Sequence, residues 1–223
     1  MTKADAPGLR ERNKLAKERA IRAAAHELFI KNGYEATTLR QIAESADVGF
    51  GTVLAYSKDK AGLLAMIFVE QLRSLPPLFA DVDETTSLED MLVKGLGRLY
   101  SFWARIPTLS SQVLQQMEFY VGNPHMDRIL ARRNEARTEL TDWVERMQRA
   151  GRISPAIDPG SAAASLFAIY TAAVREWAAS GGDIALGIAR LRELLALPLR
   201  GLTANEEFRR AEARAVGVRR SNP

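Results

Sequence analysis

The sequence predicts an all-α protein, built from an N-terminal three-helix domain with a helix-turn-helix and a larger C-terminal helical domain. Two observations support this fold class. Apolar residues recur at helical spacing along most of the 223 residues, and no segment shows strand-like alternation of useful length. Proline, glycine, Asn and Asp residues interrupt this periodicity at points typical of helix boundaries.

The first helix is expected from about Asn13 to Lys31, because Ile21, Ala25 and Phe29 fall on one face there. The preceding residues 1–12 are expected to be disordered. Asn32-Gly33 should end the helix, since glycine is the usual residue at the left-handed position after a helix.

The second helix is expected to begin at Thr38, which forms a capping-box pattern with Gln41. Asp47 then falls at a sharp turn, where it is one of the few residues besides glycine that tolerate a left-handed backbone. A short third helix is expected from about Phe50 to Ala55. These elements form the pattern of a helix-turn-helix, which places side chains in the DNA major groove.

Asp59 is a suitable N-cap for a fourth helix, which should end before Pro76-Pro77. Further helices are expected at 87–104, 108–121, 125–150, 159–180 and 184–197. Pro198 and Gly201 should end the last of them, and a further helical piece is expected near 206–215. The predicted domains are therefore residues 1–60, 61–202 and a charged tail at 203–223.

Composition limits the function classes. The chain has no cysteine, which excludes disulfides, thiolate zinc sites and cysteine nucleophiles. No apolar run is long enough to cross a membrane, and the polar N-terminus has no signal-peptide core, so a cytoplasmic location is expected. Residues 1–60 carry 11 Lys and Arg against 8 Asp and Glu, and this basic end favours a polyanionic partner, although a solvated surface explains it equally well.

The segment from Arg19 to Leu64 resembles the N-terminal domain of TetR-type transcriptional regulators. The residues that carry the resemblance are Leu28-Phe29, Gly33-Tyr34, Thr37-Thr38, Ile42-Ala43, Val48, Gly51-Thr52, Lys60 and Leu63-Leu64. Together they are specific, although each is weak alone. The rest of the chain agrees only in its helical architecture.

Three positions depart from the family pattern. Leu54 stands where an aromatic is common, Ser57 where phenylalanine is frequent, and Gly49 where serine usually begins the recognition helix. Leu54 cannot donate a phenolic hydrogen bond to phosphate. The space left at Ser57 is expected to be filled by Tyr56 or by neighbouring apolar residues.

Eight residues are predicted to contact DNA. Thr38 and Thr52 are short hydroxyl donors suited to phosphate, and Lys60 places an ammonium at a helix start, where a phosphate partner would offset the unfavourable helix dipole. Arg40 is the candidate for reading a guanine edge, with a solvated surface charge as the alternative. The remaining candidates are Phe50, Gly51, Leu54 and Tyr56; Phe50 is expected to be exposed because Val53 already supplies the core contact.

Basic residues near the N-terminus form a second candidate contact with DNA. Residues 1–22 hold seven basic and three acidic groups, and a solubilising tail is the open alternative. The members of this arm are Arg10, Arg12, Lys14, Lys17 and Arg19.

The resemblance implies a small-molecule pocket in the larger domain and no cofactor. Most aromatic residues there are needed for an ordinary core, so packing is the competing interpretation for each candidate. The candidate ligand-binding residues are Tyr100, Trp103, Gln116, Tyr120, His125, Tyr170 and Arg175.

The last two predicted helices suggest self-association, with a monomer that packs them against each other internally as the alternative. Small residues run from Ser161 to Ala173, and apolar residues recur from Ile184 to Leu195, which suits a four-helix interface across a two-fold axis. A homodimer is also what two recognition helices on a palindromic DNA operator require. The resemblance thus predicts a ligand-responsive repressor that leaves its operator when the larger domain binds a small molecule.

Two other function classes were weighed. An enzyme is disfavoured because the sequence has only two histidines and no phosphate loop, dinucleotide glycine pattern, nucleophile elbow or HExxH. A DNA-binding nucleoid or adaptor protein without a small-molecule effector remains the alternative. No metal site is predicted.

Overall fold

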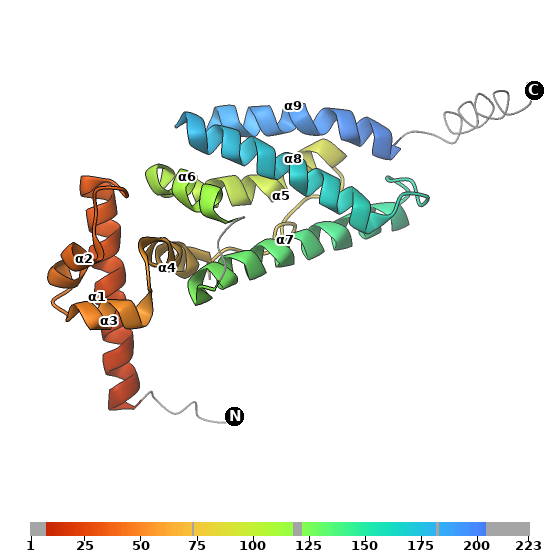
Figure 1. Cartoon of the computed structure of the whole chain (residues 1–223). Helices are drawn as coiled ribbons and strands as arrows, with labels where there is room; N and C mark the ends of the chain where they lie inside the picture. Colours follow the sequence, from red (N-terminus) through yellow and green to blue (C-terminus); the bar gives the residue numbers. More distant parts are fainter. Residues whose placement is uncertain (1–7, 73, 118–121, 182, 204–223) are drawn as a thin grey trace, which may run out of the picture. The chain divides into compact units, whose positions relative to one another are not determined.

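The structure of the protein, a computed structural model, describes residues 8–72, 74–117, 122–181 and 183–203 (Figure 1). Every regular element within these ranges is a helix, which confirms the all-α prediction. The helices are α1 (Leu9–Asn32), α2 (Leu39–Ser45), α3 (Phe50–Tyr56), α4 (Lys60–Leu72), α5 (Leu88–Trp103), α6 (Pro107–Gln116), α7 (Pro124–Arg149), α8 (Pro159–Ser180) and α9 (Ile184–Thr203).

Three predicted boundaries are wrong. Helix α6 ends at Gln116 rather than at residue 121. Helix α1 begins at Leu9 rather than near Asn13, so part of the predicted disordered segment is helical. Helix α9 passes through Pro198 instead of ending there. Proline removes one intrahelical hydrogen bond, but Leu199 and Leu202 beyond it are buried, and their burial offsets that loss. The predicted piece at 206–215 lies outside the described residues.

Contacts divide the chain into two compact units. One comprises Met1–Leu75 and Phe102–Arg133, and the other Pro76–Ser101 and Asn134–Pro223. The division falls inside α5 and α7, so each of these helices contributes residues to both units. The functional limits predicted at residues 60 and 202 stay a prediction.

In the first unit, α1 packs against α2, α4 and α6, and α2 packs against α3. Ile21, Ile42 and Val53 are fully buried at the centre of the three N-terminal helices. The buried hydroxyl of Thr37 donates to the carbonyl oxygens of Leu28 and Gly33, at 3.1 and 2.8 Å, and so fixes the chain between α1 and α2.

Local signals set the turn between α2 and α3 as the sequence predicts. The Thr38 hydroxyl accepts from the Gln41 N–H, and the Gln41 side chain accepts from the Thr38 N–H, which completes the capping box. Asp47 has a φ of 51°, the left-handed conformation expected for it. The Asp59 carboxylate accepts from the Gly62 N–H at 2.8 Å and begins α4.

The core of α4 is apolar on nearly every side, from Ala61 to Val69. Phe68 meets the rings of Phe102 and Trp103 at centroid distances of 5.9 and 5.5 Å. A helix buried all round is a core element. Helix α4 is therefore held within the first unit by the residues at the end of α5.

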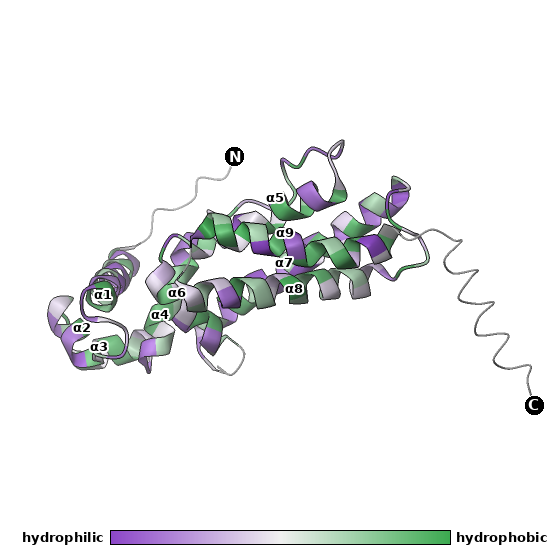
Figure 2. Ribbon diagram, turned by 90° about the horizontal axis from the view of Figure 1, so that it is seen from above, coloured by the Kyte–Doolittle hydropathy of each residue, from purple (hydrophilic) through white to green (hydrophobic). Residues whose placement is uncertain are grey.

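The second unit has its own aromatic core. Phe79 stacks on the fully buried Trp143 of α7 at 5.3 Å. Arg152 donates to the carbonyl oxygens of Glu84 and Thr86, both at 2.6 Å, and so fixes the connection that precedes α5. Helices α8 and α9 lie side by side in both views (Figures 1 and 2). No helix in the described ranges is both long and apolar enough to cross a membrane.

Gly187 offers a test of packing in this unit. A Cβ at this position would lie 2.8 Å from both Trp177 Cδ1 and Tyr100 Cε1, two rigid rings. We expect Gly187→Ala to lower the free energy of unfolding by about 1–3 kcal/mol through overpacking, as measured by chemical denaturation. Gly201→Ala in the same helix is the matched control, because a Cβ there meets nothing within 4 Å. Equal stability of the two variants would contradict this account of the packing.

Candidate nucleic-acid interface

Helix α3 has one buried apolar side and one exposed apolar side. Val53 is fully buried, whereas Phe50 and Leu54 are each 39% exposed. The predicted exposure of Phe50 is therefore confirmed, and its contact with DNA stays a prediction. Exposed apolar side chains on a short helix are suited to thymine methyl groups in the major groove.

The structure brings Arg40 and Phe50 together. The guanidinium carbon of Arg40, at the start of α2, lies 5.4 Å from the centroid of the Phe50 ring at the start of α3. Such a cation–π contact restricts the orientation of the guanidinium. Its N–H groups remain suited to a base edge or a phosphate.

Gly51 and Thr52 lie beside these residues on α3. A Cβ at Gly51 would meet nothing within 4 Å, so no contact within the described protein requires glycine there. The absence of a side chain leaves the backbone open to close approach by a partner. The half-buried Thr52 occupies the first turn, and its N–H donates to the Gly49 carbonyl oxygen at 2.8 Å.

Two predicted phosphate contacts have protein partners in the structure. Lys60 Nζ donates to the carbonyl oxygens of Tyr34 and Glu35 at 3.0 and 2.9 Å, and it lies 4.8 Å from the centroid of the Tyr34 ring. These acceptors account for an ammonium at a helix start without any phosphate. A lysine has three N–H donors, and the Glu35 carboxylate also forms an ion pair with this ammonium at 3.7 Å, so a phosphate would share the third donor with it. Thr38 caps α2 while its side chain stays exposed.

Tyr56 ends α3 and points to α1. Its hydroxyl donates to the Lys14 carbonyl oxygen at 2.8 Å, and burial raises the pKa of its phenol, with a smaller contribution from Glu18. Tyr56 therefore holds the recognition helix against α1 and does not fill the space beside Ser57. Asn123 lies there instead, with its side-chain amide 3.2 Å from the Ser57 hydroxyl.

Sequence reasoning missed Asn123 as a neighbour of the recognition helix. Asn123 directly precedes the helix expected at 125–150, and no local pattern in the sequence indicates that it contacts a residue 66 positions earlier. The small side chain at Ser57, in place of a frequent aromatic, was the one available signal.

The predicted basic arm is part of α1. The helix begins at Leu9, and its basic side chains are exposed before the first buried residue, Ile21. These charges are therefore exposed along an α-helix and do not belong to an irregular N-terminal segment. The residues concerned are Arg10, Arg12, Lys14, Lys17 and Arg19.

Two of the candidate ligand-binding residues lie together in the second unit. The ring of Tyr100 is 5.7 Å from the centroids of both Tyr170 and Trp177. Tyr100 is fully buried, and its hydroxyl has no hydrogen-bond partner in the described protein. Burial raises the pKa of this phenol. A buried hydroxyl of this kind is suited to bond a ligand or an ordered water.

The other candidates are dispersed. Trp103 packs on Phe68 in the first unit, and Arg175 is half-buried on α8. His125 lies in the first turn of α7, where burial lowers the pKa of its imidazole and favours the neutral form. The side chain of Gln116 and the whole of Tyr120 lie outside the described residues.

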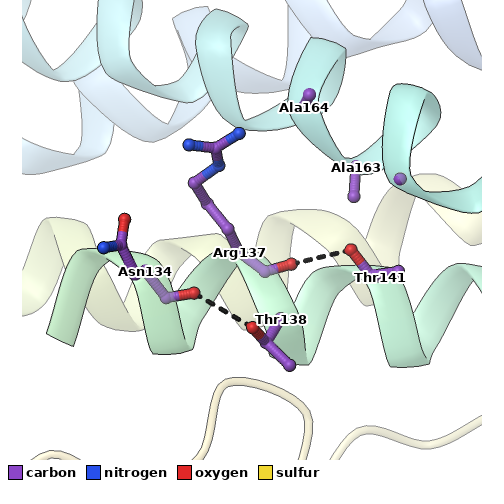
Figure 3. A pocket seen from close by; sticks show the side chains of 7 residues that line it. Asn134, Arg137, Thr138, Thr141, Ala163 and Ala164 are labelled. Atoms are coloured by element: carbon purple, nitrogen blue, oxygen red, sulfur yellow. Dashed lines mark hydrogen bonds between the residues drawn. The ribbon is translucent and has the colours of Figure 1, made fainter. Parts of the chain in front are cut away.

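A pocket of about 330 Å³ opens between α7 and α8 (Figure 3). Polar side chains of α7 and small residues of α8 line it together, and none of the predicted ligand-binding residues does. Thr138 and Thr141 hydrogen-bond the backbone one turn earlier in α7, while the exposed Arg137 extends toward α8 (Figure 3).

Helix α9 exposes two leucines, Leu186 at 70% and Leu197 at 76%. Alanines 168, 172 and 179 of α8 are also exposed. Apolar and small residues on two helices that pack together form a surface suited to another protein. Figure 2 shows hydrophobic residues mixed with hydrophilic ones along both helices.

Comparison with known proteins identifies the N-terminal part. Residues 21–67 match the family described as bacterial regulatory proteins, tetR family. No curated protein matches the chain by sequence.

Several solved structures share the fold. A bacterial regulatory protein of the tetR family from Rhodococcus RHA1 is 27% identical, with a TM-score of 0.56 over 85% of this chain and 98% of that one. FadR of Bacillus subtilis, solved with stearoyl-CoA, is 21% identical, with a TM-score of 0.59 over 80% and 97% of the two chains. FadR of Thermus thermophilus, a repressor solved with lauroyl-CoA, is 23% identical, with a TM-score of 0.57 over 80% and 93%.

The matched segment spans α1 to α4, the same helices that carry the exposed face of α3 and the capped turn before it. The resemblance read from residues 19–64 is thus confirmed by both the sequence match and the fold. Residues 21–67 thus form an N-terminal domain of the tetR family of bacterial regulatory proteins, and the chain shares its fold with solved regulators of that family.

Proposed function

We propose that the chain is a repressor that binds an inverted-repeat operator as a homodimer and leaves it when a small molecule binds the larger helical domain. The observation that carries this proposal is the division of α3 into a buried Val53 and an exposed face with Phe50 and Leu54. A short helix anchored on one side and apolar on the other is suited to the major groove. Arg40, stacked on Phe50, adds a donor for a guanine edge.

The dimer is proposed to form through α8 and α9. Leu186 and Leu197 lose exposed apolar surface if a second copy packs on them, and the alanines of α8 allow close approach of a partner helix. A two-fold axis there makes the contact self-complementary. Each operator half then receives one copy of α3.

The effector is proposed to be an acyl thioester of coenzyme A, or a compound with a similar apolar chain. The Bacillus subtilis and Thermus thermophilus FadR proteins, which share this fold, were solved with stearoyl-CoA and lauroyl-CoA. The cluster of Tyr100, Tyr170 and Trp177 offers apolar surface together with one buried hydroxyl. A ligand releases DNA only if it binds the DNA-incompetent arrangement more tightly.

Selection from a randomised duplex pool tests DNA recognition directly. We expect the recovered sequences to contain an inverted repeat whose half-sites are about 10 base pairs apart, because two recognition helices must meet successive major grooves. Light scattering of the free protein should give twice the 24.7 kDa mass of one chain. Recovery of unrelated sequences, or a monomer on DNA, would contradict the proposal.

The same selection with Arg40→Ala separates base reading from backbone contact. Loss of preference at one base pair in each half-site assigns Arg40 to base reading, since bidentate contacts discriminate between bases. A weaker complex with an unchanged consensus assigns it to phosphate.

Gly51→Ala tests close approach of DNA to α3. The added Cβ meets no protein atom within 4 Å, so we expect unfolding to be unaffected or to require up to about 1 kcal/mol more. Operator affinity should nevertheless fall about tenfold, because the methyl group occupies space needed by the duplex. Gly97→Ala in α5 is the matched control, because its added Cβ meets only Ile188 Cδ1 at an ordinary contact distance of 3.9 Å, and it should bind DNA like the wild type. Unchanged affinity of Gly51→Ala would place this surface away from DNA.

Lauroyl-CoA and stearoyl-CoA are the probes for the effector. We expect either compound to dissociate the protein from its selected duplex, as measured by fluorescence anisotropy, while coenzyme A alone does not. Tyr100→Phe should retain stability, because a partnerless buried hydroxyl is removed, and should change the concentration needed for release. Retention of DNA at saturating acyl-CoA would reject this effector class and leave DNA binding intact.

A further inference from the structure

A buried polar cluster lies at the point where α3 ends and α7 begins. Ser57 is 3% exposed and Asn123 is 5% exposed, and both belong to the first unit. The Asn123 amide donates to the Ser57 hydroxyl at 3.2 Å, and that hydroxyl donates to the Asp59 carbonyl oxygen at 2.9 Å. The two groups are therefore hydrogen-bonded in a site from which water is largely excluded.

The other end of the Asn123 side chain begins α7. Its carbonyl oxygen accepts from the backbone N–H groups of His125 and Met126 at 2.9 and 3.4 Å. This is the bonding of an N-cap residue. A single side chain thus fixes both the first turn of α7 and the residue that follows α3.

Gly62 makes room for this arrangement. A Cβ at that position would lie 1.9 Å from Asn123 Nδ2 and 2.0 Å from Ser57 Oγ. No side chain fits at position 62 while the Ser57–Asn123 hydrogen bond is kept. The three residues therefore depend on one another, although they lie on three different segments.

A second contact holds the end of α3 on its other side. The Tyr56 hydroxyl donates to the Lys14 carbonyl oxygen of α1 at 2.8 Å. The end of α3 is thus bonded to α1 on one side and to the start of α7 on the other. Val53 is the one buried residue of the seven in α3, so these polar contacts contribute much of what fixes its direction.

We propose that Asn123 is a positioning residue for DNA reading, through which the start of α7 sets the orientation of the recognition helix. The inference rests on the proposed DNA binding of α3. When the first turn of α7 moves, one of two things follows: α3 moves with it, or the Asn123–Ser57 hydrogen bond breaks. Both change how α3 meets the major groove. The start of α7 is therefore a direct connection to α3 that does not pass through α4.

Ser57→Ala tests the connection because it removes the bond to Asn123, together with the hydroxyl's bond to the Asp59 carbonyl oxygen, and leaves the cap of α7 in place. Asp158→Ala is the matched control: Asp158 caps α8 in the second unit by accepting from the Ser161 N–H at 2.8 Å. The removal of a cap lowers stability by about 1 kcal/mol, a loss similar to that expected for one buried hydrogen bond. Both variants remove the polar contacts of one side chain at a helix end, and only Ser57→Ala removes a contact with the end of α3.

Amide hydrogen exchange of the free protein is the first measurement. We expect Ser57→Ala to increase exchange in α3 about fivefold relative to Asp158→Ala, because one hydrogen bond to the end of α3 is lost. Asn123→Ser should behave like Ser57→Ala, since serine retains a helix cap but is too short to reach position 57. If Ser57→Ala and Asn123→Ser show the same amide exchange in α3 as Asp158→Ala, the inference is overturned, whether or not the protein binds DNA.

Affinity for the duplex selected by the wild type is the second measurement. Ser57→Ala should weaken binding about fivefold while Asp158→Ala does not, and the Ser57→Ala/Asn123→Ala double variant should bind no more weakly than Asn123→Ala alone. Additive losses would show that the two residues act separately and would refute the linkage. If the wild type selects no inverted repeat, the proposed function fails, and the exchange data still decide whether Asn123 positions α3.

Discussion

The position of α3 depends on very few contacts, and the rest of the first unit is organised around that limitation. A helix of seven residues is too short to be stable alone, so neighbouring elements must hold it. Val53 supplies the one fully buried side chain. The capped start of α2, the left-handed Asp47 and the hydrogen bonds of Tyr56 then fix the two ends. The exposed face with Phe50 is free for a partner because anchoring is confined to the other side and the ends.

Lys60 shows how a charge can serve the fold and the partner together. Its ammonium bonds the carbonyl oxygens after α1, and a phosphate contact would use the third donor, which it would share with the Glu35 carboxylate. These carbonyl oxygens belong to residues that directly follow α1, whereas Lys60 begins α4. The distance between the ammonium and the carbonyl oxygens therefore depends on how α4 packs on α1. The Lys60 side chain therefore takes part both in the packing of α4 on α1 and in the predicted phosphate contact. Removing it would lower the stability of the protein and its affinity for DNA together.

Sequence patterns predicted what is decided locally. The Thr38–Gln41 capping box, the turn at Asp47 and the Asp59 cap each involve residues at most three positions apart, and all three are as predicted. Predictions failed where the structure depends on contacts between residues that are far apart in the sequence. Pro198 is tolerated inside α9 because Leu199 and Leu202 are buried beyond it, and Asn123 reaches Ser57 across 66 residues. For the same reason, the sequence indicated which aromatic residues were candidates for an effector site but not that Tyr100 meets Tyr170 while Trp103 meets Phe68.

The polar character of the cluster at Ser57 has a physical consequence. A buried amide bonded to a hydroxyl contributes only about 1 kcal/mol net, and apolar groups of the same shape would stabilise at least as well. Apolar packing, however, is non-directional, whereas a hydrogen bond weakens steeply with angle. Gly62 has no side chain, and this leaves room for the Ser57–Asn123 hydrogen bond. The contact between α3 and α7 at this point therefore depends on the geometry of that bond. A contact of this kind stabilises the protein little but makes the direction of α3 sensitive to small movements of α7.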